Sequence, residues 1–139
     1  MIRIVIDTCV LVSAIKSNQG ASFKLLSLLP KKIFTYHIST ALVLEYEDVL
    51  KRPKLNLSLT SFEVDKLLDI LCLLGKKHLI HFHWRPLLND ESDDFIGELA
   101  INAKVDVIVT HNIKDFGYIS KFGIGIVTPH EFLKLIGEY

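Results

Sequence analysis

The sequence predicts a three-layer α/β/α domain with a central parallel sheet, and three observations lead to this fold class. Short apolar, β-branched runs alternate along the chain with longer segments of helical periodicity, as in strands joined by crossover helices. The strands expected over 3–6 and 105–109 are apolar and β-branched at most positions, as in parallel sheets that are covered on both faces. The 139 residues contain no Pro-, Gly- or Ser-rich linker, which favours a single domain over 1–139.

The expected elements alternate between strands and helices along the whole chain. In order, they are a strand over 3–6, helical residues over 10–29 with an interruption at 17–20, a strand over 33–36, a helix over 40–51, a helix from 60 or 61 to 74, a weak strand over 78–83, a helix over 93–103, strands over 105–109 and 124–127, and a terminal helix over 129–136.

Boundary residues justify the first half of this order. Residues 3–6 (RIVI) are apolar, mostly β-branched and followed by Asp7, which favours a buried strand. Residues 21–29 are rich in leucine and are followed by Pro30, which stops the helix. Ser39 is suited to cap the next helix, because its hydroxyl can accept a hydrogen bond from a free backbone N–H.

Periodicity and caps justify the second half. In the helix that ends at 74, apolar residues recur every three or four positions and charged residues occupy the other faces. Ser92 is expected to cap the helix that follows it. Residues 105–109 are a strong strand candidate and 124–127 a weaker one. Pro129 is expected in the first turn of the last helix, where its missing N–H is tolerated.

Composition excludes some classes of protein and leaves others open. Apolar runs such as 4–6 and 9–12 are far shorter than the ~18 residues of a membrane-spanning helix, and no signal peptide is visible. We therefore expect a cytoplasmic protein with no membrane partner. Cys9 and Cys72 fit free thiols better than a disulfide framework. The net charge of zero neither supports nor excludes nucleic acid as a partner.

Right-handed crossovers would bring the carboxyl ends of the strands to one edge of the sheet, where function gathers in such folds. Asp7 directly follows the first expected strand, so it belongs to this edge. The alternative for Asp7 is an ordinary helix N-cap for the segment that starts near Val10.

Glu45 lies in the middle of the apolar helical stretch over 41–46 (ALVLEY). Carboxylates are rarely buried without a partner. Glu45 therefore either belongs to the solvent-facing stripe beside Asp48 or points inward to a cation. The pattern leaves both interpretations open.

Four acidic residues open the helix expected over 93–103: Asp90, Glu91, Asp93 and Asp94. The helix dipole favours one or two of them at an N-terminus, but four repel one another unless a positive group is near. The apolar pairs at 95–96 and 99–100 continue the packed face of the helix. This spacing favours Asp94 beside the sheet edge rather than in open water.

The segment over 110–116 (THNIKDF) directly follows another buried strand and is expected at the same edge. Asn112 offers a carbonyl oxygen, and Asp115 offers a carboxylate further along the turn. The alternative is a polar turn that only leads the chain out of the strand.

Together, these oxygen-bearing side chains would suit a hard cation such as Mg²⁺ or Mn²⁺. Without a metal, clustered carboxylates would repel, and at least one would tend to be protonated. With a metal, the cluster could activate water and stabilise the charge of a phosphodiester transition state. Phosphodiester hydrolysis is therefore the reaction that these residues suit best.

Taken in order, the motifs resemble those of PIN-domain nucleases over essentially the whole chain. They are residues 4–14 (IVIDTCVLVSA) for the opening strand and helix, Ser39 to Glu45-Tyr46 for the central Glu helix, residues 90–96 (DESDDFI) running into Glu98-Leu99-Ala100 for the third acidic motif, and residues 107–110 (VIVT) with Asn112 and Asp115 for the fourth. Each motif is weak alone, but the ordered set is fairly specific.

The chain is most similar to the small stand-alone PIN toxins of prokaryotic toxin–antitoxin systems, the VapC-like endoribonucleases. The resemblance implies an Mg²⁺- or Mn²⁺-dependent enzyme that cleaves single-stranded RNA, with Asp7, Glu45 and Asp94 as metal ligands. Asn112 or Asp115 would orient the water or a second ion. The resemblance also implies a homodimer and a cognate antitoxin, a segment of which covers or enters the active site.

The chain departs from the family pattern at two places. Cys9 stands where Asn is usual, so a polar contact could be lost. Thr110-His111-Asn112 replaces the Thr-Gly-Asp turn of many members, and the neutral Asn112 would hold a metal less strongly unless Asp115 substitutes. Asp93 is a further candidate ligand through water.

Histidines and two competing functions complete the expectations. We interpret His78, His81 and His83 as ordinary surface or strand residues, whereas His111 is nearer to the expected site and could contact a phosphate. The first competitor is a PIN-fold RNA- or protein-binding module with a weakened or inactive site. The second is a phosphotransfer enzyme or phosphatase that uses Asp7 as nucleophile, but a dehalogenase-like phosphatase would need an Asp where Cys9 stands.

Overall fold

The structure of the chain, a computed structural model, describes residues 1–79 and 91–138, with the backbone alone for 91–94. In the described residues, five strands alternate with helices largely in the order that the sequence predicts, but the helix between β4 and β5 was not expected. The elements are β1 (Arg3–Ile6), α1 (Thr8–Lys16), α2 (Ala21–Ser27), the 3₁₀ helix η1 (Leu29–Lys31), β2 (Thr35–Ile38), α3 (Thr40–Leu50), η2 (Pro53–Leu55), α4 (Ser61–Leu74), β3 (Lys76–Lys77), α5 (Glu91–Ala103), β4 (Val107–Val109), η3 (Ile113–Phe122), β5 (Gly125–Val127) and α6 (Pro129–Leu135).

The strands form one parallel sheet in the order β3-β2-β1-β4-β5. β1 is central, and its Ile4 lies opposite Tyr36 of β2 on one side and Val107 of β4 on the other. The strand order reverses at β1, because the chain first builds outward through β2 and β3 and then crosses to β4. Folds of this kind bind ligands in the crevice at the carboxyl ends of the strands where the order reverses, which here lies between β1 and β4.

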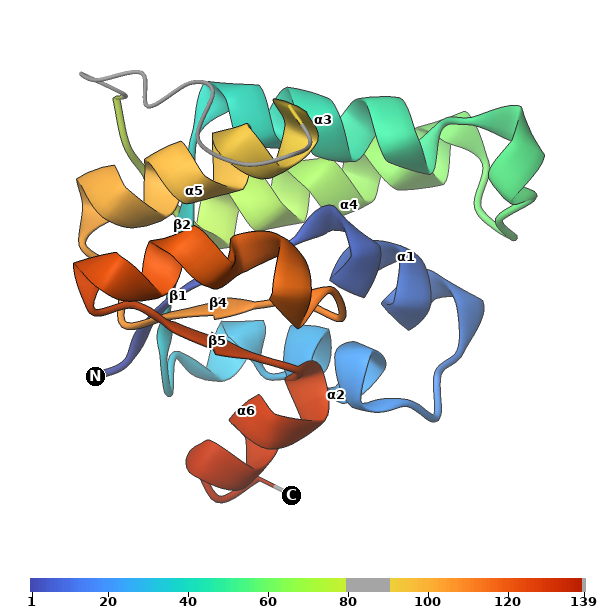
Figure 1. The fold of residues 1–139 in the computed structure, drawn as a ribbon. Helices are drawn as coiled ribbons and strands as arrows, with labels where there is room; N and C mark the ends of the chain where they lie inside the picture. Colours follow the sequence, from blue (N-terminus) through green and yellow to red (C-terminus); the bar gives the residue numbers. More distant parts are fainter. Residues whose placement is uncertain (80–90, 139) are drawn as a thin grey trace.

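The helices cover the sheet on both sides (Figure 1) and complete the three-layer α/β/α arrangement that the sequence predicts. α1 contacts α2 and α3, α3 contacts α4, and α2 contacts α6, while α5 contacts η3, β1 and β2. Right-handed crossovers put the helices of the β1–β2 and β2–β3 connections on one face, and α5, which connects strands in the opposite direction, on the other.

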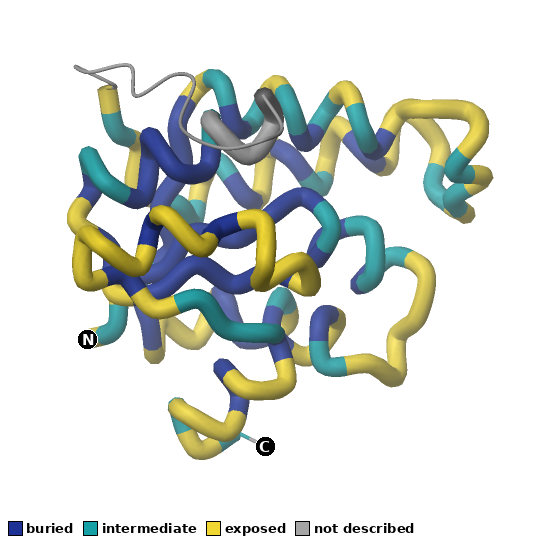
Figure 2. The backbone as a smooth tube through the Cα atoms, in the orientation of Figure 1, coloured by how far each residue is buried: buried dark blue, intermediate teal, exposed yellow. Residues whose placement is uncertain are grey.

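A continuous apolar core holds these layers together. Figure 2 shows buried residues along the central strands β1, β2 and β4 and exposed residues on the outer helical turns. Ile4, Val5 and Ile6 of β1 are fully buried, as expected for a central parallel strand. Phe34 and Phe132 meet edge to face, with ring centroids 5.3 Å apart, and link the start of β2 to α6. None of the described helices combines the length and apolarity that crossing a bilayer requires.

The structure corrects the first expected boundaries. α1 begins at Thr8 rather than near Val10. The second strand spans Thr35–Ile38 rather than 33–36, because Lys32 has a left-handed backbone that ends η1 and the ladder begins where the Thr35 N–H donates to the Ile2 carbonyl.

Later boundaries change as well. α5 already includes Glu91, so Ser92 lies inside the helix and is not its N-cap. Strand β3 covers Lys76–Lys77, before the range 78–83; residues 78 and 79 are outside any strand, and 80–83 lie outside the described residues. The strand expected over 105–109 is shortened to Val107–Val109.

Candidate active site

The carboxyl ends of β1 and β4 place Asp7 beside Thr110. The Asp7 N–H donates to the Val109 carbonyl at 2.9 Å, and the Thr110 N–H donates to the Val127 carbonyl at 2.9 Å. The ladder of the sheet therefore continues one residue beyond the strands and fixes the backbone of both residues. This is the edge of the sheet where the strand order reverses, the expected place for a site in this topology.

The carboxyl group of Asp7 is held by two side-chain donors. Its Oδ2 accepts a hydrogen bond from Thr110 Oγ1 at 2.6 Å and one from Cys9 Sγ at 3.3 Å. Asp7 occupies the N-cap position of α1, but its side chain makes no capping bond. The capping interpretation is therefore right for the backbone of Asp7 and wrong for its carboxyl group.

Burial dominates the electrostatics of Asp7. Only 6% of the residue is exposed, and burial raises the pKa of its carboxyl group, although the hydrogen bonds from Thr110, Cys9 and the Thr8 backbone oppose this shift. The negative charge of Asp115 raises this pKa further. A cation would strongly stabilise the ionised carboxylate, because its charge would offset both the burial of Asp7 and the repulsion from Asp115.

Cys9 keeps a polar role at the position where Asn is usual. Burial, followed by the charge of Asp7, raises the pKa of the Cys9 thiol to about 12. The group therefore stays a protonated thiol at neutral pH and donates its S–H to Asp7. The polar contact that the substitution put in doubt is present, though a thiol is a weak donor.

Two buried tyrosines fix helix α3 against the end of β1. The Tyr46 hydroxyl donates to the carbonyl of Ile6, the residue before Asp7, and the Tyr36 hydroxyl donates to Tyr46 at 3.2 Å. Burial raises the pKa of the Tyr46 hydroxyl, so it remains a neutral donor. This contact fixes the position of α3 relative to Asp7, the residue that follows Ile6.

Glu45 precedes Tyr46 and lies at the border between the buried and exposed faces of α3. It is half-buried, whereas Asp48 is exposed and pairs with Arg52 at 2.7 Å. The two acidic side chains therefore differ in environment, and Asp48, with Leu44, belongs to the solvent-facing stripe. Glu45 is less exposed than that stripe, but within the described residues no direct hydrogen bond joins it to Asp7.

Asn112 and Asp115 follow β4 at the same edge, but the chain between them is not a simple turn. It enters η3 at Ile113, with Asn112 in the N-cap position and without a side-chain capping bond. The Asn112 N–H donates to Thr110 Oγ1 at 2.9 Å, and the Asp115 N–H donates to the Asn112 carbonyl at 3.0 Å. Both side chains are exposed.

The acidic motif at 90–94 can be placed only by its backbone. α5 begins at Glu91 and leads directly into β4, so its first turn lies at the carboxyl edge of the sheet. Asp93 and Asp94 belong to this turn, but their side chains are outside the described ones, and Asp90 is outside the described residues.

The described oxygen donors of the candidate site, Asp7 and Glu45, suit a hard cation. Asp7 and Glu45 provide carboxylate oxygens, the ligands that Mg²⁺ and Mn²⁺ select. Among the side chains that the structure describes, no group of three or more His, Cys, Asp or Glu is arranged to hold a metal ion. The third expected ligand, Asp94, is not among those side chains.

Sequence reasoning assigned no role to Thr110 or Ser22, which both act at this edge. Ser22 is 2% exposed on α2, and its Oγ lies 3.1 Å from Nε2 of His111. The position of Thr110 directly after a strand could have indicated its role, because Asp7 is placed in the same way. Ser22 gave no such indication, since a contact across 89 positions leaves no local pattern.

Two further histidines, His37 and His78, form a pair at the sheet. His78 contacts His37 of β2, with 2.6 Å between Nε2 and Nδ1, so His78 is part of a histidine pair rather than an isolated residue. His37 is 3% exposed, and its Nε2 is buried without a hydrogen-bond partner in the described part of the chain. His81 and His83 lie outside the described residues.

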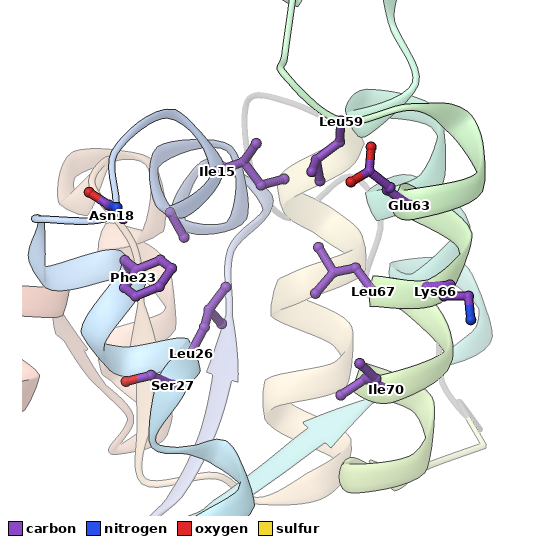
Figure 3. Close-up of a pocket in the computed structure, with 11 residues that line it drawn as sticks. Ile15, Asn18, Phe23, Leu26, Ser27, Leu59, Glu63, Lys66, Leu67 and Ile70 are labelled. Carbon is purple, nitrogen blue, oxygen red and sulfur yellow. The ribbon is translucent and has the colours of Figure 1, made fainter.

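An apolar groove of about 570 Å³ lies between α1 and α2 on one side and α4 on the other. Figure 3 shows Ile15, Phe23 and Leu26 across the groove from Leu67 and Ile70. Phe23 is 44% exposed and Ile70 is 51% exposed, so large apolar side chains of this groove meet solvent. Such a surface is typical of a site for a protein partner.

Comparison with known proteins supports the fold and gives a family. A family model described as PIN domain matches residues 3–114. A solved structure, the crystal structure of VapBC2 from Rickettsia felis bound to a DNA fragment from their promoter, matches with a TM-score of 0.62 and 21% identity, and covers 90% of this chain and 97% of that chain. At this identity the likeness shows a shared fold. No curated protein sequence matches the chain.

Proposed function

The chain belongs to the PIN domain family, and from this premise we propose that it is a metal-dependent endoribonuclease that hydrolyses single-stranded RNA. The observation that carries the proposal is the buried carboxyl group of Asp7, which follows β1 at the carboxyl edge of the sheet and is oriented by Thr110 and Cys9. A desolvated carboxylate in a fixed orientation is suited to bind a cation rather than to cap a helix.

The residues that would hold Mg²⁺ or Mn²⁺ are Asp7, Glu45 and Asp94. A bound divalent ion would lower the pKa of a water ligand and neutralise charge on the scissile phosphate. Thr110 would hold the carboxyl group of Asp7 in a fixed orientation. The contact of Tyr46 with Ile6 would fix the position of the adjacent Glu45 along the site.

Asn112 and Asp115 would act on the attacking water. The Asn112 side chain makes no hydrogen bond that caps η3. Asp115 is close enough to Asp7 for its charge to raise the Asp7 pKa. We propose that one of them accepts a hydrogen bond from the water and orients its lone pair toward phosphorus. Basic side chains around the edge would hold the RNA backbone without reading bases.

The first test is cleavage of a labelled single-stranded RNA with Mn²⁺, with Mg²⁺ and with EDTA. The variant Asp94→Asn should lose cleavage, while Asp69→Asn, a change on the exposed face of α4, should keep it. Cleavage that persists in EDTA, or in folded Asp94→Asn, contradicts the proposal.

A second candidate is an RNA- or protein-binding module with an inactive site. The neutral Asn112, where many family members carry Asp, favours it. In the same experiment, RNA binding and metal-dependent thermal stabilisation without cleavage in any metal would support this second function over the first.

We further propose that the protein acts in the cytoplasm as a homodimeric toxin with a cognate antitoxin. The groove between α1, α2 and α4 supports a partner, because its exposed apolar side chains match one face of an amphipathic helix. Ala14, which lines the groove, is seven residues after Asp7 on α1, roughly 10 Å along the helix axis. A partner segment that leaves the groove along α1 would therefore reach the proposed active site.

A further inference from the structure

We propose that His111 is a phosphate-binding residue of the RNA site and that the buried Ser22 positions its ring for this contact. The inference rests on the proposed function, because it names how the same edge would hold its substrate. It concerns two residues that lie 89 positions apart in the sequence and meet only in the fold.

The backbone of His111 belongs to the proposed active site. His111 directly follows Thr110, whose hydroxyl donates to Asp7 Oδ2 at 2.6 Å. The His111 N–H donates to Cys9 Sγ at 3.5 Å, and Cys9 itself donates to Asp7. The imidazole is therefore attached to the hydrogen-bonded segment that orients the Asp7 carboxyl group, and it cannot move far from it.

The ring of His111 is held in place, although the residue is exposed. Nε2 lies 3.1 Å from Ser22 Oγ, and Ser22 is 2% exposed on α2. An exposed histidine normally gains little from a fixed rotamer, because water satisfies its ring nitrogens equally well. Here a buried hydroxyl restrains the ring, which reduces the conformational entropy that a ligand contact would otherwise remove.

The remaining ring nitrogen suits an anion. When the Ser22 hydroxyl donates to Nε2, the neutral ring carries its proton on Nδ1 and can donate it. Nδ1 makes no hydrogen bond within the described part of the chain. A phosphate oxygen only accepts hydrogen bonds, so it selects this tautomer, whereas Asp7 on the same edge would repel the phosphate unless a cation lies between them.

The test measures RNA binding separately from cleavage. Fluorescence anisotropy gives the Kd of a fluorescein-labelled single-stranded RNA 12-mer with Ca²⁺ in place of Mn²⁺, so that a divalent cation is present at the acidic edge, and cleavage assays with Mn²⁺ give kcat and KM. The variants are His111→Gln and Ser22→Ala, and Ser27→Ala on the same helix is the matched control, because Ser27 is exposed and, among the described residues, its hydroxyl bonds the Lys24 carbonyl of its own helix. Thermal unfolding confirms that each variant is folded.

We expect His111→Gln to raise Kd and KM about tenfold and to change kcat less than threefold, as for loss of one hydrogen bond to a charged group. Ser22→Ala should raise Kd and KM by about threefold with kcat unchanged, and Ser27→Ala should match the wild type. In ¹H–¹⁵N spectra of the imidazoles, RNA should shift the His111 ring in the wild type, and the shift should shrink in Ser22→Ala.

A Kd within twofold of the wild type in folded His111→Gln overturns the proposal. So does a fall in kcat with Kd unchanged, because the ring would then act in the chemical step and not in binding. If the wild type binds RNA but never cleaves it, the nuclease proposal fails, while the Kd series still decides the role of His111.

Discussion

At the residue scale, the carboxyl group of Asp7 combines a high degree of burial with an acidic neighbour. Its pKa is raised by burial first and also by the charge of Asp115, so the charged form is disfavoured in the folded protein when no cation is bound. A raised carboxyl pKa contributes stability at acidic pH that is lost as the pH rises through the folded pKa. At neutral pH the Asp7 charge therefore destabilises the cation-free fold.

We expect Asp7→Asn to abolish measurable cleavage, with a rate at least about 100-fold below that of the wild type, because a metal ligand is lost. In EDTA the same variant should unfold about 2–5 °C higher than the wild type, since the buried charge is removed. Mn²⁺ should raise the Tm of the wild type by mass action and leave Asp7→Asn unchanged. Differential scanning fluorimetry measures both, and an equal Mn²⁺ response in the two proteins would contradict Asp7 as a ligand.

Tyr46→Phe tests the contact that joins α3 to the end of β1. Without the hydroxyl, the Ile6 carbonyl and the Tyr36 hydroxyl each lose a buried partner. We expect the free energy of unfolding in urea to fall by about 1–3 kcal/mol. Tyr118→Phe, at a residue that is 58% exposed, is the control and should change it by less than about 0.5 kcal/mol.

At the element scale, the end of α4 packs so closely on β2 that only glycine fits at position 75. A Cβ on Gly75 would lie 2.9 Å from the Leu71 carbonyl oxygen and 3.1 Å from the Tyr36 ring. Gly117 in η3 has open space around it. The contrast separates a steric requirement from the general effect of a Gly→Ala change.

Gly75→Ala should therefore lower the free energy of unfolding by about 1–3 kcal/mol through overpacking. Gly117→Ala should leave the free energy of unfolding nearly unchanged, within about 0.5 kcal/mol. Urea unfolding followed by circular dichroism gives both values. A Gly75→Ala protein as stable as the wild type would show that α4 can shift away from β2 without loss.

The pair of His37 on β2 and His78 after β3 should make the sheet sensitive to acid. Burial, followed by the nearby His78, Lys76 and Arg3, lowers the pKa of His37 to about 4, although Asp106 opposes the shift. A lowered histidine pKa gives stability that is present above the unfolded value of 6.5 and is lost as the pH falls toward 4.

We expect stability to fall by on the order of 1–2 kcal/mol between pH 7 and pH 4.5 because of this pair. His37→Gln should reduce that loss, whereas His130→Gln, an exposed position on α6, should not. Urea midpoints at the two pH values give the comparison. Equal acid sensitivity in His37→Gln and the wild type would exclude His37 as its source.

At the scale of the whole molecule, the proposed active site and the apolar groove are separate surfaces linked by α1. The site lies at the carboxyl edge of the sheet, and the groove lies between α1 and α2 on one side and α4 on the other. Changes in the groove should therefore affect a protein partner without affecting RNA cleavage by the free protein.

If the proposed antitoxin binds in the groove, Ile70→Glu should weaken its binding about 30-fold or more, because an apolar anchor is replaced by a charge. Leu73→Glu is the matched control: Leu73 is on the same helix, 82% exposed, and does not line the groove. Isothermal titration gives the affinities, and the cleavage assay should give the same kcat for all three proteins. Equal affinities of both variants would place the partner elsewhere.

The sequence by itself determined the fold class, the order of the elements and the family motifs. Local properties set these features: β-branched runs for β1 and β4, a serine before α3, and a proline at the start of α6. Pro30 does not end a helix at residue 29 as expected, because α2 already ends at Ser27 and Pro30 lies in the first turn of η1. Asp7 and Asn112 could also be assigned to one edge, because in a parallel sheet every strand that follows a right-handed crossover ends on the same side.

Tertiary structure alone decided the partners of the site residues and several boundaries. The start of β2 depends on the carbonyl of Ile2, the residue before β1, and no local property of Ile33 or Phe34 contains that information. The contacts of Thr110 with Asp7, and of Ser22 with His111, join residues about 90 to 100 positions apart. Such contacts depend on how layers pack after the chain has crossed the sheet, so only the assembled fold determines them.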